Sequence, residues 1–308
     1  MDQPRPCGCK GCRTCLLCEK DYDIIKESTL NLNNGTYIYC PLCNKAWPGW
    51  DTEDYKLHPN HQGEPIDYPG IYMDLDFLSV EEESKLIEDL DSMPWDLSQS
   101  GRRKQNFGPK CNFKKRKLKL GDFKGFPRST KFVQDKFKST SMLKDFQTIE
   151  QCSLEYDPCR GASIDPHVDD CWIWGERIVT VNLLADSVLT MTYNDKPTRY
   201  NLDCVSNYPS VLDGSGNFAK DKCYTVQPLM DGQRHPVVRI PMPRRSLLIM
   251  YGAARYDWEH QILREDITSR RVCLAYREFT PPYLGENSED TAKFVLLKAK
   301  EFWDTEVN

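Results

Sequence analysis

Residues 178–183, with the sequence Ile-Val-Thr-Val-Asn-Leu, form a short apolar run in which β-branched side chains predominate. Such a run is typical of a buried β-strand rather than of a helix. Similar runs occupy residues 188–193, 246–251 and 271–277, and turn-forming residues separate them. Because several short strands follow one another without intervening helices, the pattern favours a β-sandwich or a jelly roll over a doubly wound α/β sheet.

The segments that flank these strands are predicted to contain helices. Ser79 and Glu82 have the spacing of a capping box, and apolar side chains follow at helical intervals, so we expect a helix at about residues 79–93. A second helix is expected near residues 130–146, and a closing helix within residues 286–308. The fold class is therefore predicted to be mainly β with flanking helices.

Residues 70–285 are predicted to form one globular domain. Residues 194–236 within it are polar and rich in turn-forming residues, and indicate a long surface insertion. Residues 46–69 contain many Pro, Gly, Asp and His residues, which are typical of a linker. Residues 1–45, which precede this linker, form a cysteine-rich segment.

The overall composition excludes several classes of protein. The chain has 308 residues, of which 39% are hydrophobic, so it can bury a sizeable core and is not disordered as a whole. Its net charge of −5 argues against a protein whose surface as a whole binds polyanions. No run of 18 apolar residues is present, and the first residues lack the apolar run of a signal peptide. We therefore expect a cytoplasmic and nuclear location with no membrane partner.

Cysteines are concentrated at the start of the chain, where seven of the 14 lie within the first 43 residues. Two CxxC pairs separated by 21 residues have nearly the spacing of a four-cysteine zinc ribbon. They supply the predicted ligands of a structural zinc ion: Cys15, Cys18, Cys40 and Cys43. The surplus Cys7, Cys9 and Cys12 leave open an alternative ligand set or a second site. His58 and His61 are expected to be surface residues of the linker.

A candidate metal site begins with His167 and Asp169, which follow an extended segment. Side chains two positions apart on an extended chain point to the same side, so the two can face one point. A single His-x-Asp sequence often arises by chance, so it is weak evidence for a metal site when taken alone. A second histidine, His260, follows the strand at residues 246–251 and could return to the same point. Two imidazoles and one carboxylate form a facial triad that leaves open positions on Fe(II).

Arg271 and Arg277 are a candidate anion-binding pair. They lie six residues apart on one predicted strand and therefore share a face. Arginines on an inner face are costly unless they are paired, so two of them suggest a bound dicarboxylate. A solvated outer face would explain them equally well.

The His-x-Asp sequence, the later histidine and the arginine pair follow one another along the chain. In this order they resemble the AlkB-like branch of the Fe(II)- and 2-oxoglutarate-dependent dioxygenases. The resemblance spans residues 70–280, and three stretches carry it: residues 165–170 (Asp-Pro-His-Val-Asp-Asp), 247–260 and 271–277. It implies a double-stranded β-helix (jelly-roll) core.

The resemblance also implies roles for individual residues. The implied iron ligands, which form the catalytic centre, are His167, Asp169 and His260. Arg271 matches the arginine that grips the distal carboxylate of 2-oxoglutarate, Arg277 matches the second arginine of that motif, and Tyr156 matches a tyrosine that contacts the co-substrate. Leu154 and Cys273 depart from the family, because asparagine often stands at both positions.

The reaction implied by the resemblance consumes O2 and 2-oxoglutarate, hydroxylates an N-methyl group and releases formaldehyde, succinate and CO2. The expected substrate is a monomethyl-lysine on a protein, with actin as the expected partner. One alternative is N6-methyladenine in DNA, and another is a zinc-containing, non-catalytic scaffold with a vestigial iron site. Ten Lys or Arg residues and one acid lie within residues 98–125, where the family places its substrate lid. The lid is expected to use Arg102, Arg103 and Lys104.

Overall fold

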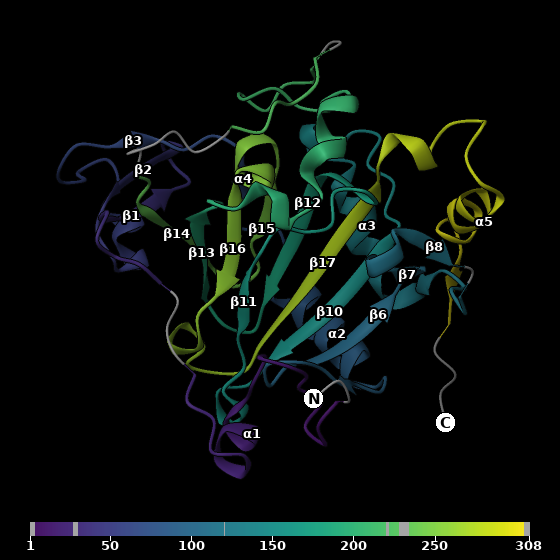
Figure 1. The fold of residues 1–308 in the computed structure, drawn as a ribbon, viewed down its shortest axis with the longest axis horizontal. Coiled ribbons are helices and arrows are strands. Elements are labelled where there is room, and N and C mark those ends of the chain that lie inside the picture. The colour runs from purple at the N-terminus through teal and green to yellow at the C-terminus, as the bar shows by residue number, and fades with distance from the viewer. Residues whose placement is uncertain (1–3, 27–29, 120, 220–221, 228–233, 305–308) are drawn as a thin grey trace.

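The chain is described by a computed structural model that covers residues 4–26, 30–119, 121–219, 222–227 and 234–304 (Figure 1). Two seven-stranded sheets dominate the fold. In spatial order, the first sheet contains β4 (Ile71–Asp74), β15 (Leu247–Met250), β12 (Trp174–Leu183), β17 (Arg271–Phe279), β10 (Glu150–Tyr156), β6 (Arg103–Phe107) and β5 (Asp96–Leu97). The second contains β11 (Ile164–His167), β16 (Trp258–Ile262), β13 (Ser187–Tyr193), β14 (Val237–Met242), β1 (Thr36–Cys40), β2 (Lys45–Pro48) and β3 (Ile66–Asp67).

The eight strands from β10 to β17 are arranged as expected for a jelly roll. The order β15-β12-β17-β10 in the first sheet faces the order β11-β16-β13-β14 in the second, and all neighbours within these two groups are antiparallel. All four strands predicted from apolar runs are present as β12, β13, β15 and β17. The predicted mainly β fold is therefore confirmed, and its topology is consistent with a jelly roll.

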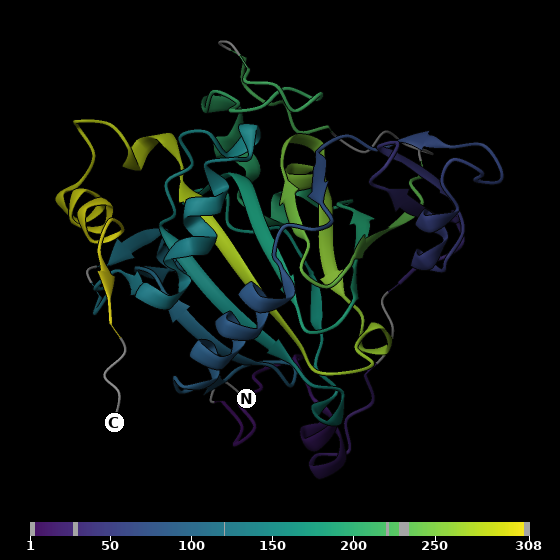
Figure 2. The same cartoon turned by 180° about the vertical axis from the view of Figure 1, so that it is seen from behind.

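Helices cover the outer face of the first sheet (Figure 2). The predicted capping box is present, because the Ser79 Oγ accepts a hydrogen bond from the Glu82 amide at 3.1 Å and α2 (Val80–Asp91) follows. The second helix, α3 (Lys131–Phe137), ends earlier than predicted. The Ser139 hydroxyl there donates to the Lys136 carbonyl at 2.7 Å, a local bond that competes with continuation of the helix.

The remaining elements are short. The closing helix α5 (Asp290–Lys298) occupies part of the predicted range, and β18 (Phe302–Trp303), which follows it, pairs with β9 (Phe126–Pro127). The other helices are α1 (Leu16–Asp21) and α4 (Gly252–Tyr256), and β7 (Lys110–Asn112) and β8 (Lys117–Lys119) form a hairpin. Among the described residues, no helix has the length and apolar character needed to cross a membrane.

The N-terminal region is joined to the core more closely than the sequence predicted. Strand β1 pairs in parallel with β14, and β2 and β3 extend the same sheet further. Residues 46–69, predicted to be a linker, thus include two strands and the 3-10 helix η1 (Thr52–Leu57). The physical reason is that β14 would otherwise present unpaired backbone groups at a sheet edge, which β1 covers.

The predicted surface insertion, residues 194–236, is largely exposed in its described part, but its first third packs against the end of the sheets. Its 3-10 helix η7 (Leu202–Asn207) buries Leu202 and Val205 in a small cluster with Val168, Cys171 and Tyr256. This cluster lies beside the candidate metal ligands, because Val168 separates His167 from Asp169.

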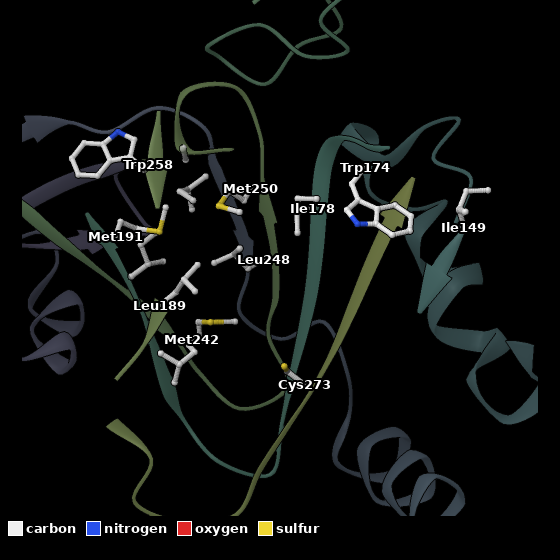
Figure 3. Close-up of a cluster of buried hydrophobic side chains, with 14 of the residues drawn as sticks. Ile149, Trp174, Ile178, Leu189, Met191, Met242, Leu248, Met250, Trp258 and Cys273 are labelled. Carbon is white, nitrogen blue, oxygen red and sulfur yellow. The ribbon is translucent and has the colours of Figure 1, made fainter. Parts of the chain in front are cut away.

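Strand β17 divides the apolar interior into two layers. Its even-numbered residues, such as Tyr276, pack against α2 and α3, with the Phe137 ring meeting the Tyr276 ring edge to face at 5.0 Å. Its odd-numbered residues, such as Cys273, join the cluster between the two sheets, which Figure 3 shows with Met191, Met242 and other large side chains. Because alternate residues on a strand share a face, Arg271 and Arg277 also point between the sheets.

A buried carboxylate joins four segments at one end of β10. Glu155 on β10 is 1% exposed and pairs with Arg103 on β6 at 2.5 Å, with Arg160 at 2.6 Å and with Arg270 at 2.8 Å. Burial opposes ionisation of this carboxyl, but the hydrogen bonds from the three guanidinium groups outweigh it and lower its pKa to about 2. The ion pairs hold β6 and the start of β17 against β10.

This pKa implies a test of stability against pH. Glu155 is ionised in the fold down to about pH 2, whereas its ordinary pKa is 4.5, so its contribution is complete above pH 4.5 and is lost as the pH falls toward 2. We expect Glu155→Gln to lower the free energy of unfolding at pH 7 by about 2–3 kcal/mol. Urea denaturation of both proteins at pH 7, 5 and 3 should show the difference shrinking at the lowest pH. Glu88→Gln, at an exposed helix position, is the matched control, and an equal loss in that variant would contradict the prediction.

Candidate active site

The two histidines predicted as metal ligands lie side by side on paired strands. His167 ends β11, His260 lies on β16, and the antiparallel register places the two residues opposite each other with ring centroids 4.1 Å apart. Asp169 follows β11 by two residues. One candidate ligand atom from each of the three side chains lies within 4.8 Å of the others. The fold therefore brings together all three residues, although His260 lies more than 90 positions from the other two in the sequence.

The protonation states of the three side chains suit a cation. Burial lowers the pKa of His167 and of His260, so both imidazoles are neutral near pH 7. The His167 Nδ1 lies 2.9 Å from the Asp165 carbonyl oxygen, which assigns the proton to Nδ1 and leaves Nε2 with a free lone pair. The His260 Nδ1 is buried and contacts no hydrogen-bonding partner. Two imidazoles and a carboxylate with this arrangement fit an Fe(II) ion.

Arg277 holds the carboxylate of this group. Its guanidinium donates to both oxygens of Asp169, from Nε at 3.2 Å and from Nη2 at 3.1 Å. Burial disfavours the charged form of Asp169, but the positive charge of Arg277 outweighs it, so the pKa of Asp169 lies well below its usual range. The third nitrogen of Arg277 pairs with Glu150, its register neighbour on β10, at 2.5 Å. Arg277 therefore contacts a candidate metal ligand directly.

Arg255 holds the backbone of Asp169 in place. Its side chain is completely buried, and Nη1 donates to the Asp169 carbonyl at 3.0 Å. Sequence reasoning missed both Arg255 and Glu150. Arg255 lies within the stretch 247–260 that carries the family resemblance, but nothing in the local pattern assigned it a partner. Glu150 becomes relevant only through the strand register, which the sequence does not reveal.

Arg271 lies deeper between the sheets and has a free donor. Its Nε donates to the Asn182 side-chain oxygen at 2.7 Å, and its guanidinium carbon lies 4.8 Å from the centroid of the Tyr156 ring. The Arg271 Nη1 is buried without a hydrogen-bonding partner. Because an unpaired buried guanidinium nitrogen is costly, this atom indicates a place for a bound carboxylate. Tyr156 is the register neighbour of Arg271, so the structure places both predicted co-substrate residues together.

The two positions that depart from the family are in contact. Leu154 on β10 is directly opposite Cys273 on β17, and both side chains belong to the apolar layer between the sheets. Asn182, the neighbour of Cys273 on β12, supplies the amide that holds Arg271. Here an apolar pair replaces two family asparagines, and the polar group comes from a third strand. Sequence reasoning missed Asn182, although it lies inside the strand at residues 178–183.

Aromatic and acidic side chains lie beside Asp169. The half-buried Asp170 accepts a hydrogen bond from the Trp172 indole at 3.2 Å, and burial together with the Asp169 charge raises the pKa of Asp170. The rings of Phe113 and Tyr283 meet the Trp172 ring edge to face at 6.3 and 6.2 Å. Phe113 is in the turn between β7 and β8, so part of the predicted lid lies next to the candidate active site.

The three predicted lid residues have other contacts. Arg103 pairs with the buried Glu155, and Lys104 lies beside it on β6. Arg102 donates to the Gln99 carbonyl at 3.1 Å, and its guanidinium carbon lies 6.0 Å from the Tyr156 ring centroid. Arg103 thus stabilises the sheet, and within the basic stretch Phe113, in the turn between β7 and β8, contacts Trp172 beside the site.

The four predicted zinc ligands are not brought together, and the single-site prediction needs correction. Cys15 and Cys18 cluster with Cys7 and Cys9, whereas Cys40 and Cys43 cluster with the two linker histidines, His58 and His61. The first group surrounds α1 and the second lies at the β1–β2 hairpin, which is well separated from α1 (Figure 1). The physical reason is the pairing of β1 with β14, which fixes the second CxxC pair at the sheet edge.

Comparison with known proteins identifies close relatives over almost the full chain. No protein-family model matches the chain. The chain is 38% identical over 301 residues to the mouse protein "Alpha-ketoglutarate-dependent dioxygenase alkB homolog 4", covering 96% of this chain and 94% of that protein. It is 38% identical to the human protein of the same name, covering 97% and 94%. It is 32% identical to a Caenorhabditis elegans protein named "DNA N6-methyl adenine demethylase", covering 88% and 86%.

Divalent metal binding tests the triad. We expect His260→Ala to weaken binding of Fe²⁺, or of Mn²⁺ as an air-stable substitute, by more than the roughly 10–100-fold that follows loss of a residue supporting a ligand. Equilibrium dialysis or Mn²⁺ electron paramagnetic resonance would measure the affinity. His235→Ala is the matched control, because His235 stacks on Tyr193 and belongs to none of the three clusters of candidate metal ligands in the described residues. An unchanged metal affinity in His260→Ala would show that His260 is not a ligand of the metal.

Proposed function

Because the chain belongs to the AlkB family of alpha-ketoglutarate-dependent (that is, 2-oxoglutarate-dependent) dioxygenases, we propose that it oxidatively removes the methyl group of monomethyl-lysine in a protein such as actin. The observation that carries the oxidative chemistry is the convergence of His167, Asp169 and His260 within 4.8 Å, in a domain that also buries an unpaired nitrogen of Arg271. As an enzyme of this class, the protein uses Fe(II), 2-oxoglutarate and O2.

His167, Asp169 and His260 would hold the iron. When bound, iron with 2-oxoglutarate and O2 supplies the oxidising power that hydroxylates an N-methyl group, with release of succinate, CO2 and formaldehyde. The protein fixes the geometry for this chemistry. Arg277 keeps both Asp169 oxygens oriented, and the Asp165 carbonyl sets the tautomer of His167.

Arg271 would bind the distal carboxylate of 2-oxoglutarate. Its Nη1 has no other partner, and Asn182 holds the opposite side of the guanidinium in place, so the group is oriented before the ligand arrives. Tyr156 packs against the guanidinium and closes the site on that side. The apolar pair Leu154 and Cys273 belongs to the apolar layer beside these residues.

The surroundings of Asp169 support a methylammonium group as the part of the substrate that is recognised. Trp172 with Phe113 and Tyr283 supplies aromatic surface, and Asp170 supplies a carboxylate next to it. Aromatic rings combined with an acid are a common way to bind alkylated ammonium groups. The net charge of −5 is also unfavourable for extended contact with a phosphate backbone.

N6-methyladenine in DNA is the second candidate substrate. It is favoured by the name of the Caenorhabditis elegans relative and by the exposed basic side chains of the β7–β8 hairpin. Lys114, Lys115 and Lys117 are exposed beside the site and could contact phosphates. The same lysines could equally contact an acidic protein surface, so Asp170 is the better residue for telling the two apart.

Formaldehyde release on two substrates tests the proposal. We expect turnover on a monomethyl-lysine actin preparation with Fe(II), 2-oxoglutarate and O2, and loss of turnover in His167→Ala. Asp170→Asn should lower kcat/KM for the methyl-lysine substrate by about 10–100-fold, because a hydrogen-bonded charge partner of the ammonium is lost. On DNA that carries N6-methyladenine, a neutral base, the same variant should behave as wild type. Turnover on the DNA alone would replace the proposed substrate by the second candidate. No turnover on either substrate would contradict both.

The co-substrate site has its own test. Arg271→Ala should raise the KM for 2-oxoglutarate by about 100-fold or more, because a bidentate charged contact is removed, while iron remains bound. Asn182→Ala should raise the same KM by a smaller factor and leave kcat unchanged. Initial rates over a range of 2-oxoglutarate concentrations, together with the iron content of each variant, give the result. Arg128→Ala, at an exposed arginine, is the control. Loss of iron in Arg271→Ala would mean that Arg271 has a structural role instead.

A further inference from the structure

We propose that the chain holds two zinc ions in separate sites near its N-terminus, independent of the iron site. One is a four-cysteine site, made by Cys7, Cys9, Cys15 and Cys18. The other is a two-cysteine, two-histidine site, made by Cys40, Cys43, His58 and His61. In each group, the candidate ligand atoms all lie within 4.8 Å of one another. Four such atoms around one point are what a structural zinc ion requires.

The second site, which we call the hairpin site, is built from two loops of the sheet extension. Cys40 ends β1 and Cys43 lies in the four-residue turn before β2, so the Cys-Pro-Leu-Cys turn directs both sulfur atoms to one side. The Cys40 sulfur lies 3.8 Å from the carbonyl oxygen of Tyr55 in η1, so the segment that leads to His58 packs against the turn.

The histidines of the hairpin site carry an independent signal. The Nδ1 of His58 and the Nε2 of His61 are buried atoms with no hydrogen-bonding partner. Buried polar atoms are almost always satisfied, so two unsatisfied ring nitrogens beside two cysteines need a partner that the protein itself does not supply. The Trp47 ring stacks on His61 with centroids 4.7 Å apart and donates from Nε1 to the Cys43 sulfur at 3.4 Å. This packing orients one ligand of each type.

The first site, which we call the helix α1 site, is almost completely enclosed. Cys9, Cys15 and Cys18 are at most 1% exposed and form an apolar cluster with the half-buried Cys7. The Cys15 amide donates to the Cys18 sulfur at 3.2 Å, and the Arg5 guanidinium donates to the same sulfur at 3.7 Å. These contacts fix the position of the Cys18 sulfur beside the other three.

Zinc accounts for both groups better than the alternatives. No two cysteines of the described residues form a disulfide. Sets of four thiolates, and of two thiolates with two imidazoles, are the usual ligands of tetrahedral structural zinc. Neither group contains a carboxylate, which distinguishes them from the triad of His167, Asp169 and His260. Two cysteines with two histidines also bind a Rieske [2Fe–2S] cluster, but there the cysteines and the histidines bind different iron atoms. All four candidate ligand atoms of the histidine-containing group lie within 4.8 Å of one another, as expected around a single ion.

Each proposed ion would fasten a different part of the N-terminal region to the domain. At the helix α1 site, Glu19 pairs with Arg264 at 2.7 Å, and Leu16 packs so closely on Gly161 that a Cβ there would lie 2.6 Å from its side chain. A Cβ at Gly8 would lie 2.9 Å from the Ser98 carbonyl oxygen, which places the cysteine loop against the residues that precede β6. The hairpin site instead fixes β1 and β2, and through them the edge of the sheet at β14.

Metal content of the purified full-length chain tests the proposal directly. We expect two zinc ions per chain by plasma mass spectrometry, falling to one in Cys7→Ser, to one in Cys43→Ser and to none in the double variant. His61→Ala should also reduce the content to one. Cys12→Ser is the matched control, because Cys12 lies among these cysteines, is exposed and belongs to neither group, so it should retain two. His167→Ala should also retain two, which separates this result from any failure of the iron site.

Cobalt substitution identifies which site each variant keeps. With Co²⁺ in place of zinc, Cys43→Ser should show the charge-transfer absorption of four thiolates, and Cys7→Ser the weaker absorption of two thiolates with two imidazoles. If a variant fails to fold, thiol titration of the wild-type protein still shows whether the clustered cysteines bind metal. The six clustered cysteines should be protected until a chelator is added, while Cys12 reacts at once.

Other outcomes would overturn the assignment. One zinc ion per chain that is lost in Cys43→Ser but kept in Cys7→Ser and His61→Ala would indicate one shared site with the ligands Cys15, Cys18, Cys40 and Cys43. Two zinc ions retained in both Cys7→Ser and Cys43→Ser would place the metal elsewhere. Wild-type protein without zinc, whose six clustered thiols react as fast as Cys12, would show that neither group binds metal.

Discussion

The buried ion pair between Arg277 and Asp169 is the interaction on which the candidate active site depends. Arg277 lies on β17 of one sheet and Asp169 follows β11 of the other, so the pair joins the two sheets where the metal ligands meet. Removing two charges from water is costly unless the geometry is good and the remaining polar atoms are satisfied. Here both conditions are met, because Arg277 uses three nitrogens and the Asp169 backbone carbonyl is held by Arg255.

The charge balance around this pair also explains why the site suits a cation. Arg277 faces two carboxylates, Asp169 and Glu150, and the two histidines are neutral because they are buried. Asp169 therefore stays ionised beside two neutral imidazoles. A donor set of two neutral imidazoles and one carboxylate favours a divalent cation.

The sequence predicted the strands and the metal-ligand candidates because both leave short-range patterns. Apolar β-branched runs identified β12, β13, β15 and β17, and the alternation of side chains on an extended chain placed His167 with Asp169. The sequence could not predict which strands pair. The pairing of β1 with β14 joined the supposed linker to the sheet, and the register of β10 with β17 supplied Glu150 as the partner of Arg277. These contacts join residues more than 100 positions apart, and no local pattern encodes them.

The cysteines show even more clearly that the sequence does not reveal which distant segments come together. Two CxxC pairs at a suitable spacing are compatible with one shared site, but spacing describes only the length of chain between ligands. Strand pairing of β1 with β14 carries Cys40 and Cys43 to the sheet edge, and the Glu19–Arg264 pair anchors α1 elsewhere. Once the two pairs are separated, each must complete its ligand set from nearby residues, and each has them. The resulting ligand sets differ in chemical softness from the triad. Groups that contain thiolates favour zinc, whereas two imidazoles with a carboxylate suit non-haem iron, so the ligand sets of this chain suit different metals.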